Sequence, residues 1–395
     1  MAMKREDHML EDIVRARLPQ PVLRAVRSPL RVTAVGGGTG LPSVLGGLTR
    51  LRGSHVPMEV SAVVTTCDDG GSSGKIRRRY RLPSPGDIRN CLVALTPGEN
   101  PLAEIFQHRF PGTGGLGGHT IGNLILAALA QRLGDFGSAV EAATRLLGAQ
   151  GRVLPSTVDR VDLVAQLTDG RVVRGERAIA AAGGRVARMR LKRPVPANPE
   201  ALDAVSHADL VVFGPGSLYT SVIASLLGEG MRAALASCHG WRVLVLNLFT
   251  QPGETDGYDA VDHVRAIQHH FGPVVDAVLV HARPLPQKMV SAYAANGAQV
   301  VSCDRDALAA LGVKTFASDL LGPGNKARHD AAKLGKALHD ILRSRRELHR
   351  GGMACAESSA TLVGAKRVRS SSKASGASSI GATTARGRLF SSGTG

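Results

Sequence analysis

The sequence has few aromatic residues, few cysteines and no long apolar run. Only 13 of its 395 residues are Phe, Trp or Tyr, so its core must consist mainly of Val, Leu, Ile and Ala. The five cysteines lie far apart without a Cys-x-x-Cys pair, which excludes a disulfide framework and a cysteine zinc site. No stretch approaches the roughly 18 apolar residues of a membrane-spanning helix, and the charged start MAMKREDHML is unlike a signal peptide. We therefore expect a cytoplasmic, water-soluble protein.

The net charge of +17 is concentrated at the two ends of the chain. Residues 1–31 contribute +3 and residues 343–395 contribute +8, which leaves +6 for residues 32–342. The C-terminal residues are rich in Gly, Ser and Ala, a composition typical of a disordered tail. Because the excess charge falls mainly outside the folded region, we do not expect nucleic acid as the partner. Association with RNA or with a membrane surface would depend on these termini alone.

Short apolar runs alternate with segments of helical periodicity between residues 31 and 342. Runs rich in Val, Leu, Ile and Ala predict buried strands at 31–35, 59–65, 209–213, 242–247 and 274–281. Helices are predicted at 42–51, 87–95, 120–133, 136–147, 217–227, 258–271 and 326–342. Because strands and helices alternate, we expect an α/β fold with a Rossmann-like, doubly wound and mostly parallel sheet.

Residues 151–193 interrupt this alternation. Two apolar segments flank Asp169-Gly170, a pair typical of a type I′ hairpin turn, and residues 185–192 alternate with period two. We interpret 151–193 as a small antiparallel β insertion. The predicted organisation is an N-terminal extension at 1–30, a Rossmann-like domain at 31–342 and a basic tail at 343–395.

Two glycine-rich loops follow predicted strands and lead into predicted helices. Glycine lets the backbone approach an anion closely, and a helix start offers free N–H groups. Because the carboxyl ends of parallel strands meet at one sheet edge, both loops are expected at one anion site. A tight turn without a ligand would use the same glycines. The candidate ligand-binding residues of these loops are Gly37, Gly38, Thr39, Gly40, Gly214, Gly216, Ser217 and Thr220.

Asp68 and Asp69 follow the second predicted strand. Two adjacent carboxylates there can hold Mg²⁺ or accept a hydrogen bond from a nucleotide or sugar hydroxyl. A solvated turn is the alternative. Cys67 is not expected to act as a nucleophile, because the neighbouring charge of Asp68 would raise the pKa of its thiol.

Further polar candidates lie at predicted helix starts. Asp87 suits an N-cap, which would place Arg89 and Asn90 in the first helical turn, within reach of a ligand. His119 and Asn123 lie four residues apart on one helical face, although no second metal ligand stands near His119.

The segment after the predicted strand at 242–247 adds Asn247, Thr250 and Tyr258. Tyr258 can stack on a base or sugar, or it can be a partly buried aromatic residue at a helix start. No Ser–His–Asp or Cys–His arrangement is evident, so the catalytic residues of any reaction remain unassigned.

Several motifs together resemble the gluconeogenesis factor (YvcK-like) family within the 2-phospho-lactate transferase-like superfamily. They are VGGGTGLPSVLGGL, VVTTCDDGGSSGKIRR, PSPGDIRNCLVAL, GGHTIGNLILAAL, ADLVVFGPGSLYTSVIASLL and QPGETDGYDAVDHVRAI. The resemblance spans about residues 31–342. It implies a cytoplasmic regulator that binds UDP-N-acetylglucosamine and supports cell shape and cell-wall synthesis under gluconeogenic growth. A cell-wall regulatory protein partner and a homo-oligomer are further expectations, with no cofactor required.

The resemblance also implies roles for single residues. The first glycine loop would lie at the nucleotide end, with the second loop opposite, Tyr258 at the UDP-sugar and Arg328 at its phosphates. The alternative is a Mg²⁺-dependent transferase similar to the 2-phospho-L-lactate transferases of deazaflavin cofactor synthesis, with Asp68 and Asp69 as its acidic element. The run GGSSGKIRRRYRLPSPGDIRN follows the pattern of the regulators instead.

Overall fold

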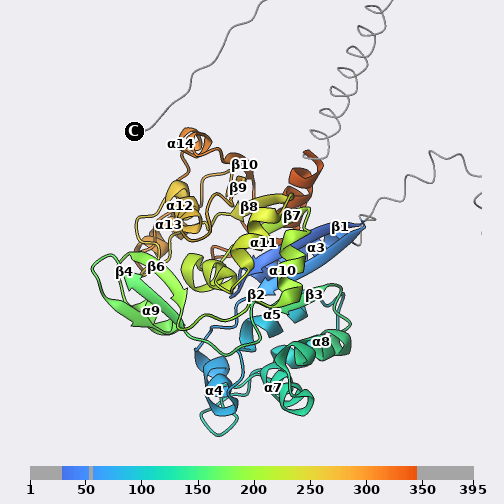
Figure 1. Ribbon diagram of the computed structural model, residues 1–395. Coiled ribbons are helices and arrows are strands. Elements are labelled where there is room, and N and C mark those ends of the chain that lie inside the picture. The colour runs from blue at the N-terminus through green and yellow to red at the C-terminus, as the bar shows by residue number, and fades with distance from the viewer. Residues whose placement is uncertain (1–28, 53–56, 345–395) are drawn as a thin grey trace, which may run out of the picture. The chain divides into compact units, whose positions relative to one another are not determined.

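A seven-stranded parallel sheet forms the centre of the computed structural model, which describes residues 29–52 and 57–344 (Figure 1). The strand order is β10-β9-β8-β7-β1-β2-β3, and every neighbouring pair is parallel. The strands are β1 (Leu30–Gly36), β2 (Met58–Val64), β3 (Arg152–Pro155), β7 (Leu210–Phe213), β8 (Trp241–Val245), β9 (Ala277–His281) and β10 (Lys314–Ser318). The predicted Rossmann-like α/β fold is therefore confirmed.

The direction of the chain across the sheet changes beside β1. The chain passes from β1 through β2 to β3, and then returns to β7 on the other side of β1 before it continues to β10. Loops at the carboxyl ends of strands separate at such a switch point and leave a crevice for a ligand. The two predicted glycine loops follow β1 and β7, so the topology places both at this crevice.

Helices and turns cover both faces of the sheet. Alternate strand residues supply two cores: Val35 and Phe213 belong to one, and Ala34 and Val212 to the other. The helices are α3 (Leu41–Arg52), α4 (Gly71–Tyr80), α5 (Gly86–Ala94), α6 (Pro101–Gln107), α7 (Ile121–Leu133), α8 (Phe136–Leu147), α10 (Pro199–Ser206), α11 (Met231–Ser237), α12 (Ala260–Phe271), α13 (Gln287–Ala294) and α14 (Arg305–Ala310). A last helix begins at residue 331. No helix among the described residues is long and apolar enough to cross a membrane.

A three-stranded antiparallel sheet lies beside the main sheet (Figure 1). Its order is β5-β4-β6, with β4 (Leu163–Leu167), β5 (Val172–Arg174) and β6 (Val186–Leu191), and α9 (Glu176–Ala181) connects β5 to β6. The predicted hairpin is thus present, but its turn is not type I′, because Gly170 has a positive φ of 88° whereas Asp169 does not. The predicted boundary at residue 151 is too early, because Arg152–Pro155 pairs with β2 in the main sheet.

The other differences from the predicted elements have local causes. Short β3 and the half-exposed, partly polar edge strand β10 were missed because neither has a strong apolar pattern. The predicted helix at 217–227 is a π-helical turn, η1 (Leu218–Ile223), followed by a 3-10 turn, η2 (Ala224–Leu226). The predicted helix at 326–342 begins only at residue 331. The helices of ten residues or fewer that were not predicted are α4, α6, α9, α10, α11, α13 and α14. The predicted N-terminal extension and tail lie almost wholly outside the described residues.

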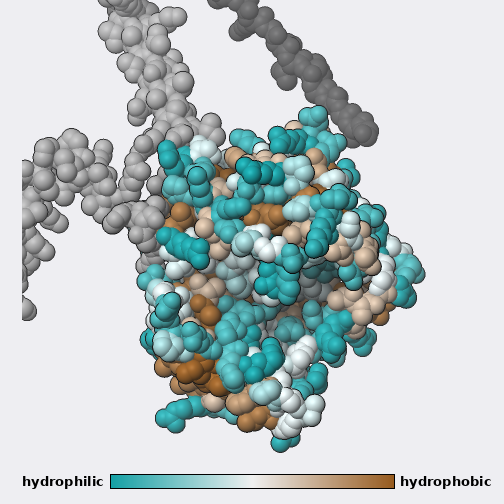
Figure 2. Space-filling view, turned by 180° about the vertical axis from the view of Figure 1, so that it is seen from behind, coloured by the Kyte–Doolittle hydropathy of each residue, from teal (hydrophilic) through white to brown (hydrophobic). Residues whose placement is uncertain are grey.

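Seen from behind, hydrophobic side chains gather at the lower left of the molecule, where α7 and α8 lie (Figure 2). Leu133 of α7 and Leu146 of α8 are about half exposed, at 47% and 53%. Their inner faces pack on β3 and α5, with Phe136 and Leu147 buried. These two helices therefore belong to the core and still leave apolar surface uncovered.

Candidate functional site

The two glycine loops touch each other at the switch point. A Cβ at Gly40 would overlap the carbonyl oxygen of Pro215, so the loops can approach only because Gly40 has no side chain. Asn247 holds the second loop from β8: the Gly216 N–H donates to Asn247 Oδ1 at 3.1 Å, and Asn247 Nδ2 donates to the Gly216 carbonyl at 2.8 Å. Loops after β1, β7 and β8 thus form one rigid edge.

A pocket of about 220 Å³ opens at this edge. One wall carries two aromatic rings, Phe249 and Tyr293, stacked with centroids 4.3 Å apart and an interplanar angle of 20°. The Tyr293 hydroxyl accepts a hydrogen bond from the Ala327 N–H at 3.0 Å, which ties the aromatic wall to the segment before the last helix. The pocket is lined by Thr39, Gly40, Ser43, Pro215, Gly216, Asn247, Leu248, Phe249, Thr250, Gln251, Tyr293, Ala327, Arg328 and His329.

Arg328 lies in the loop before the last helix, not at the start of that helix as predicted. The Arg328 carbonyl accepts from the Gly322 N–H at 2.8 Å, and Leu321 and His329 form a short antiparallel bridge. This pairing holds the exposed Arg328 at the pocket, with no carboxylate within ion-pair distance in the described part of the chain. A guanidinium in that position is available to a phosphate.

His329 follows Arg328 in the chain and is partly buried at the pocket. Burial lowers the pKa of its imidazole to about 4, although a hydrogen bond with the Leu246 backbone opposes the shift. Its Nε2 atom has no partner among the described residues. The imidazole is therefore neutral at physiological pH.

Asp68 and Asp69 belong to a second group, in the loop between β2 and α4. Asp68 Oδ1 accepts from the Gly70 N–H at 2.8 Å, and Asp68 Oδ2 is 3.5 Å from Ser84 Oγ. Asp69 Oδ1 accepts from the Arg177 N–H of α9 at 3.1 Å, so Asp69 connects the main body to the antiparallel sheet. Neither aspartate lines the pocket beside Arg328.

Asp87 joins this group to the first glycine loop. The prediction that Asp87 is an N-cap is wrong, because α5 is capped at Pro85 and Asp87 lies in the first helical turn. Its carboxylate accepts instead from the Gly38 N–H, and a Cβ at Gly37 would overlap it. Asp87 is thus a contact of the glycine loop that only the tertiary structure reveals.

The carboxylates around Asp68 repel one another. Burial raises the pKa of Asp87 to about 6, and the charge of Asp68 adds to the shift. Burial also raises the pKa of Glu176 to about 7, followed by the charges of Asp68 and Asp69. Among the described residues, no group of three or more His, Cys, Asp or Glu side chains is arranged to hold a metal ion. Two aspartates remain compatible with Mg²⁺, which retains several waters of its own.

Four other predicted residues form one hydrogen-bonded network between α4, α5 and α7. Arg89 donates to Asn123 Oδ1 at 3.2 Å and to Asn90 Oδ1 at 2.7 Å. Asn123 Nδ2 donates to Ser72 Oγ at 3.2 Å, and Ser72 Oγ is 3.0 Å from His119 Nδ1. The fold therefore brings these residues together, but not into the pocket.

Tyr258 is placed in the core, 8% exposed and outside the pocket lining. Its hydroxyl is 2.9 Å from that of Tyr219. This geometry fits the prediction of a buried aromatic residue at a helix start, and not that of a residue stacked on a base or sugar. The loop side chains nearby also serve the fold: Gln251 Nε2 donates to Ser217 Oγ at 3.0 Å, and Glu254 Oε1 accepts from the Thr220 N–H at 2.9 Å.

Cys67 is fully buried. Burial raises the pKa of its thiol to about 11, so the predicted direction is right while its chief cause is burial rather than the charge of Asp68. Such a thiol is a poor nucleophile at neutral pH.

Comparison with known proteins gives one consistent result. The family model described as 2-phospho-L-lactate transferase CofD matches residues 32–321. A protein named gluconeogenesis factor from Bacillus subtilis is 39% identical over 79% of this chain and 98% of its own length. One of the same name from Halalkalibacterium halodurans is 41% identical over 78% of this chain and 95% of its own. The crystal structure of a UPF0052 family protein from Bacillus halodurans superposes with a TM-score of 0.75 at 40% identity, over 79% of this chain and 99% of that one.

Proposed function

Because the chain belongs to the CofD family, we propose that it is a gluconeogenesis factor, a regulatory protein that binds UDP-N-acetylglucosamine at the pocket beside Arg328. The observation that carries this proposal is the pocket at the sheet's switch point, bounded by two glycine loops, a stacked aromatic pair and an unpaired arginine. We assign the cytoplasm as its location and a homo-oligomer as its state.

Each part of the pocket has a matching part of the ligand. Backbone N–H groups of the glycine loops and Arg328 suit a diphosphate, which prefers charge-assisted hydrogen bonds. Phe249 and Tyr293 offer a flat apolar wall for a pyrimidine. Asn247 bonds Gly216 and the Thr250 hydroxyl accepts from the Gln299 N–H, but each side chain lines the pocket and keeps one hydrogen to donate to a ribose or sugar hydroxyl. Tyr293 replaces Tyr258 in this proposal as the aromatic contact of the UDP-sugar.

Titration calorimetry tests the binding site. Arg328→Ala should weaken UDP-N-acetylglucosamine binding by about 1.5–3 kcal/mol, because a charge-assisted phosphate contact is lost. Lys326→Ala, an exposed cation two residues away that does not line the pocket, is the matched control. Equal dissociation constants for the wild type and Arg328→Ala would remove Arg328 from the site.

The regulatory role is tested in cells. A strain that lacks this gene should lose normal cell shape on a gluconeogenic carbon source, because cell-wall synthesis would no longer respond to the nucleotide sugar. Wild-type protein and Lys326→Ala should restore shape, whereas Arg328→Ala should not. Full rescue by Arg328→Ala would separate the pocket from that role.

A transferase is the second candidate, since the family description names one and the carboxylate group lies next to the first glycine loop. Asp68 and Asp69 would hold Mg²⁺, which would neutralise phosphate charge. Asp68→Asn should then remove any effect of Mg²⁺ on UDP-sugar binding while the circular dichroism spectrum stays unchanged. Identical affinity with and without Mg²⁺ in both proteins would reject the metal role, and heat release that continues after saturation would indicate turnover.

A further inference from the structure

Most of the net positive charge of the folded body lies in one segment. Residues 157–193, which contain the antiparallel sheet, have nine Lys or Arg and four Asp or Glu, a net charge of +5. The whole of residues 32–342 has +6. The excess is therefore a property of this small sheet and not of the body in general.

Three of the four carboxylates of this segment form ion pairs with arginines. Asp162 pairs with Arg77 of α4 at 2.8 Å, Asp169 with Arg171 at 2.7 Å, and Asp159 with Arg193 at 3.7 Å. Arg188 and Arg190 of β6 are exposed, and neither has an ion-pair partner within the described ranges. Two strand residues that are two positions apart face the same side of a sheet, so these two guanidinium groups lie side by side.

A groove of about 360 Å³ runs along this edge of the sheet. Arg188 and Arg190 line it from β6, and Arg232 lines it from α11. Glu229 is the one carboxylate in its lining. Apolar side chains complete the walls, among them Met189, Leu191, Leu226, Leu227 and Phe271.

The exposed edge of β6 is not free for an added peptide strand. The Met189 N–H points away from β4 and donates to His270 Nε2 of α12 at 2.9 Å, so the imidazole already occupies the middle of the edge. Strand addition needs a row of free backbone groups. The groove therefore suits a small ligand better than an extended polypeptide.

We infer that this groove is a second ligand site, separate from the pocket beside Arg328, which binds a phosphate-bearing small molecule through Arg188, Arg190 and Arg232. Guanidinium groups bind phosphate oxygens in pairs of parallel hydrogen bonds, and the apolar walls would contact the remainder of the molecule. A site volume of several hundred Å³ matches small-molecule sites in proteins. The two sites do not depend on each other for this inference.

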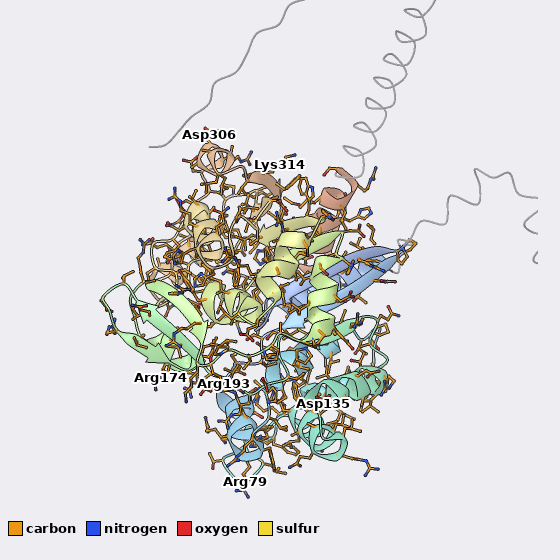
Figure 3. The ribbon with its side chains drawn as sticks, in the orientation of Figure 1. Arg79, Asp135, Arg174, Arg193, Asp306 and Lys314 are labelled. Atoms are coloured by element: carbon orange, nitrogen blue, oxygen red, sulfur yellow. The ribbon has the colours of Figure 1, made fainter. Side chains whose placement is uncertain are left out.

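Titration of pyrophosphate into the full-length protein tests the inference. The double variant Arg188→Ala/Arg190→Ala should weaken pyrophosphate binding at the groove at least tenfold. The control Arg160→Ala/Arg174→Ala removes the same charge from the same segment without touching the groove, and should bind like the wild type. Arg174 lies on β5, at the opposite edge of the small sheet (Figure 3).

Every other outcome identifies a different explanation. Loss of all pyrophosphate binding in Arg328→Ala, with Arg188→Ala/Arg190→Ala unchanged, would assign the anion to the first pocket and overturn the inference. Equal losses in the two double variants would reduce the groove to general surface charge. Binding of poly-L-glutamate or of phosphatidylglycerol vesicles without binding of pyrophosphate would make the surface a protein or membrane contact instead.

Discussion

Single residues decide how close the two glycine loops can come and which groups face them. Gly37 and Gly40 have no space for a side chain, because Asp87 and Pro215 occupy it. Asn247 bonds the second loop through both of its amide atoms. The site is therefore preorganised: the two loops are held in position before a ligand arrives, which lowers the entropy cost of binding.

The partly buried His329 gives the stability of the protein a pH dependence. Its folded pKa of about 4 lies below the ordinary 6.5, so its stabilising effect is complete above pH 6.5 and is lost as pH falls toward 4. His329→Gln removes this titration. Between pH 7.5 and 4.5 the free energy of unfolding of the wild type should fall by roughly 2–3 kcal/mol more than that of the variant.

Urea unfolding at the two pH values measures this difference. His207→Gln, an exposed imidazole on the surface, is the control and should follow the wild type. Parallel pH profiles for the wild type and His329→Gln would mean that His329 is not buried as a neutral group.

At the scale of elements, the π-helical turn η1 connects the second glycine loop to the antiparallel sheet. Its Tyr219 donates a hydrogen bond to the Val186 carbonyl of β6 at 3.3 Å and lies 2.9 Å from the Tyr258 hydroxyl. The Arg185 guanidinium lies over the Tyr258 ring, 4.9 Å from its centroid. Because η1 directly follows the loop at Gly216, the small sheet is attached to the ligand pocket through these tyrosines.

Tyr219→Phe should therefore loosen the small sheet without unfolding the protein. The loss of a buried hydroxyl that contacts both Val186 and Tyr258 should lower the free energy of unfolding by about 1–2 kcal/mol. Amide exchange should become faster in β6 and stay unchanged in β1. Tyr80→Phe is the control, because Tyr80 is 43% exposed. Equal rates of amide exchange in β6 for Tyr219→Phe and Tyr80→Phe would contradict the proposed link.

At the scale of the whole molecule, charge separates the ends of the chain from its body. Residues 345–395 have a net charge of +7, more than the whole of residues 32–342. Removal of residues 345–395 should lower the salt concentration that elutes the protein from heparin, because fewer counterions are released on binding. The melting temperature should not change. Elution at the same salt concentration would show that the body, and not the end of the chain, binds polyanions.

The sequence by itself determined the class of fold and the main loops. Runs such as 31–35 and 209–213 predicted strands correctly. A parallel strand is buried on both faces, so nearly all of its residues are apolar, and this pattern is visible in the sequence. The Asp169-Gly170 hairpin was equally visible, because a tight turn needs a residue such as Gly170 that accepts a positive φ, although the type I′ turn itself was wrong. β3 and β10 were not visible, since short edge strands owe their pairing to neighbours distant in sequence.

Only the tertiary structure decided which polar residues share a site. The family resemblance implied Tyr258 and Arg328 as ligand contacts, yet the fold buries Tyr258 against Tyr219 and leaves Arg328 at the pocket. Tyr293 enters the pocket from α13, and no local pattern marked it. The physical reason is that a strand or helix forms through nearby residues, whereas a pocket forms where elements far apart in sequence pack together.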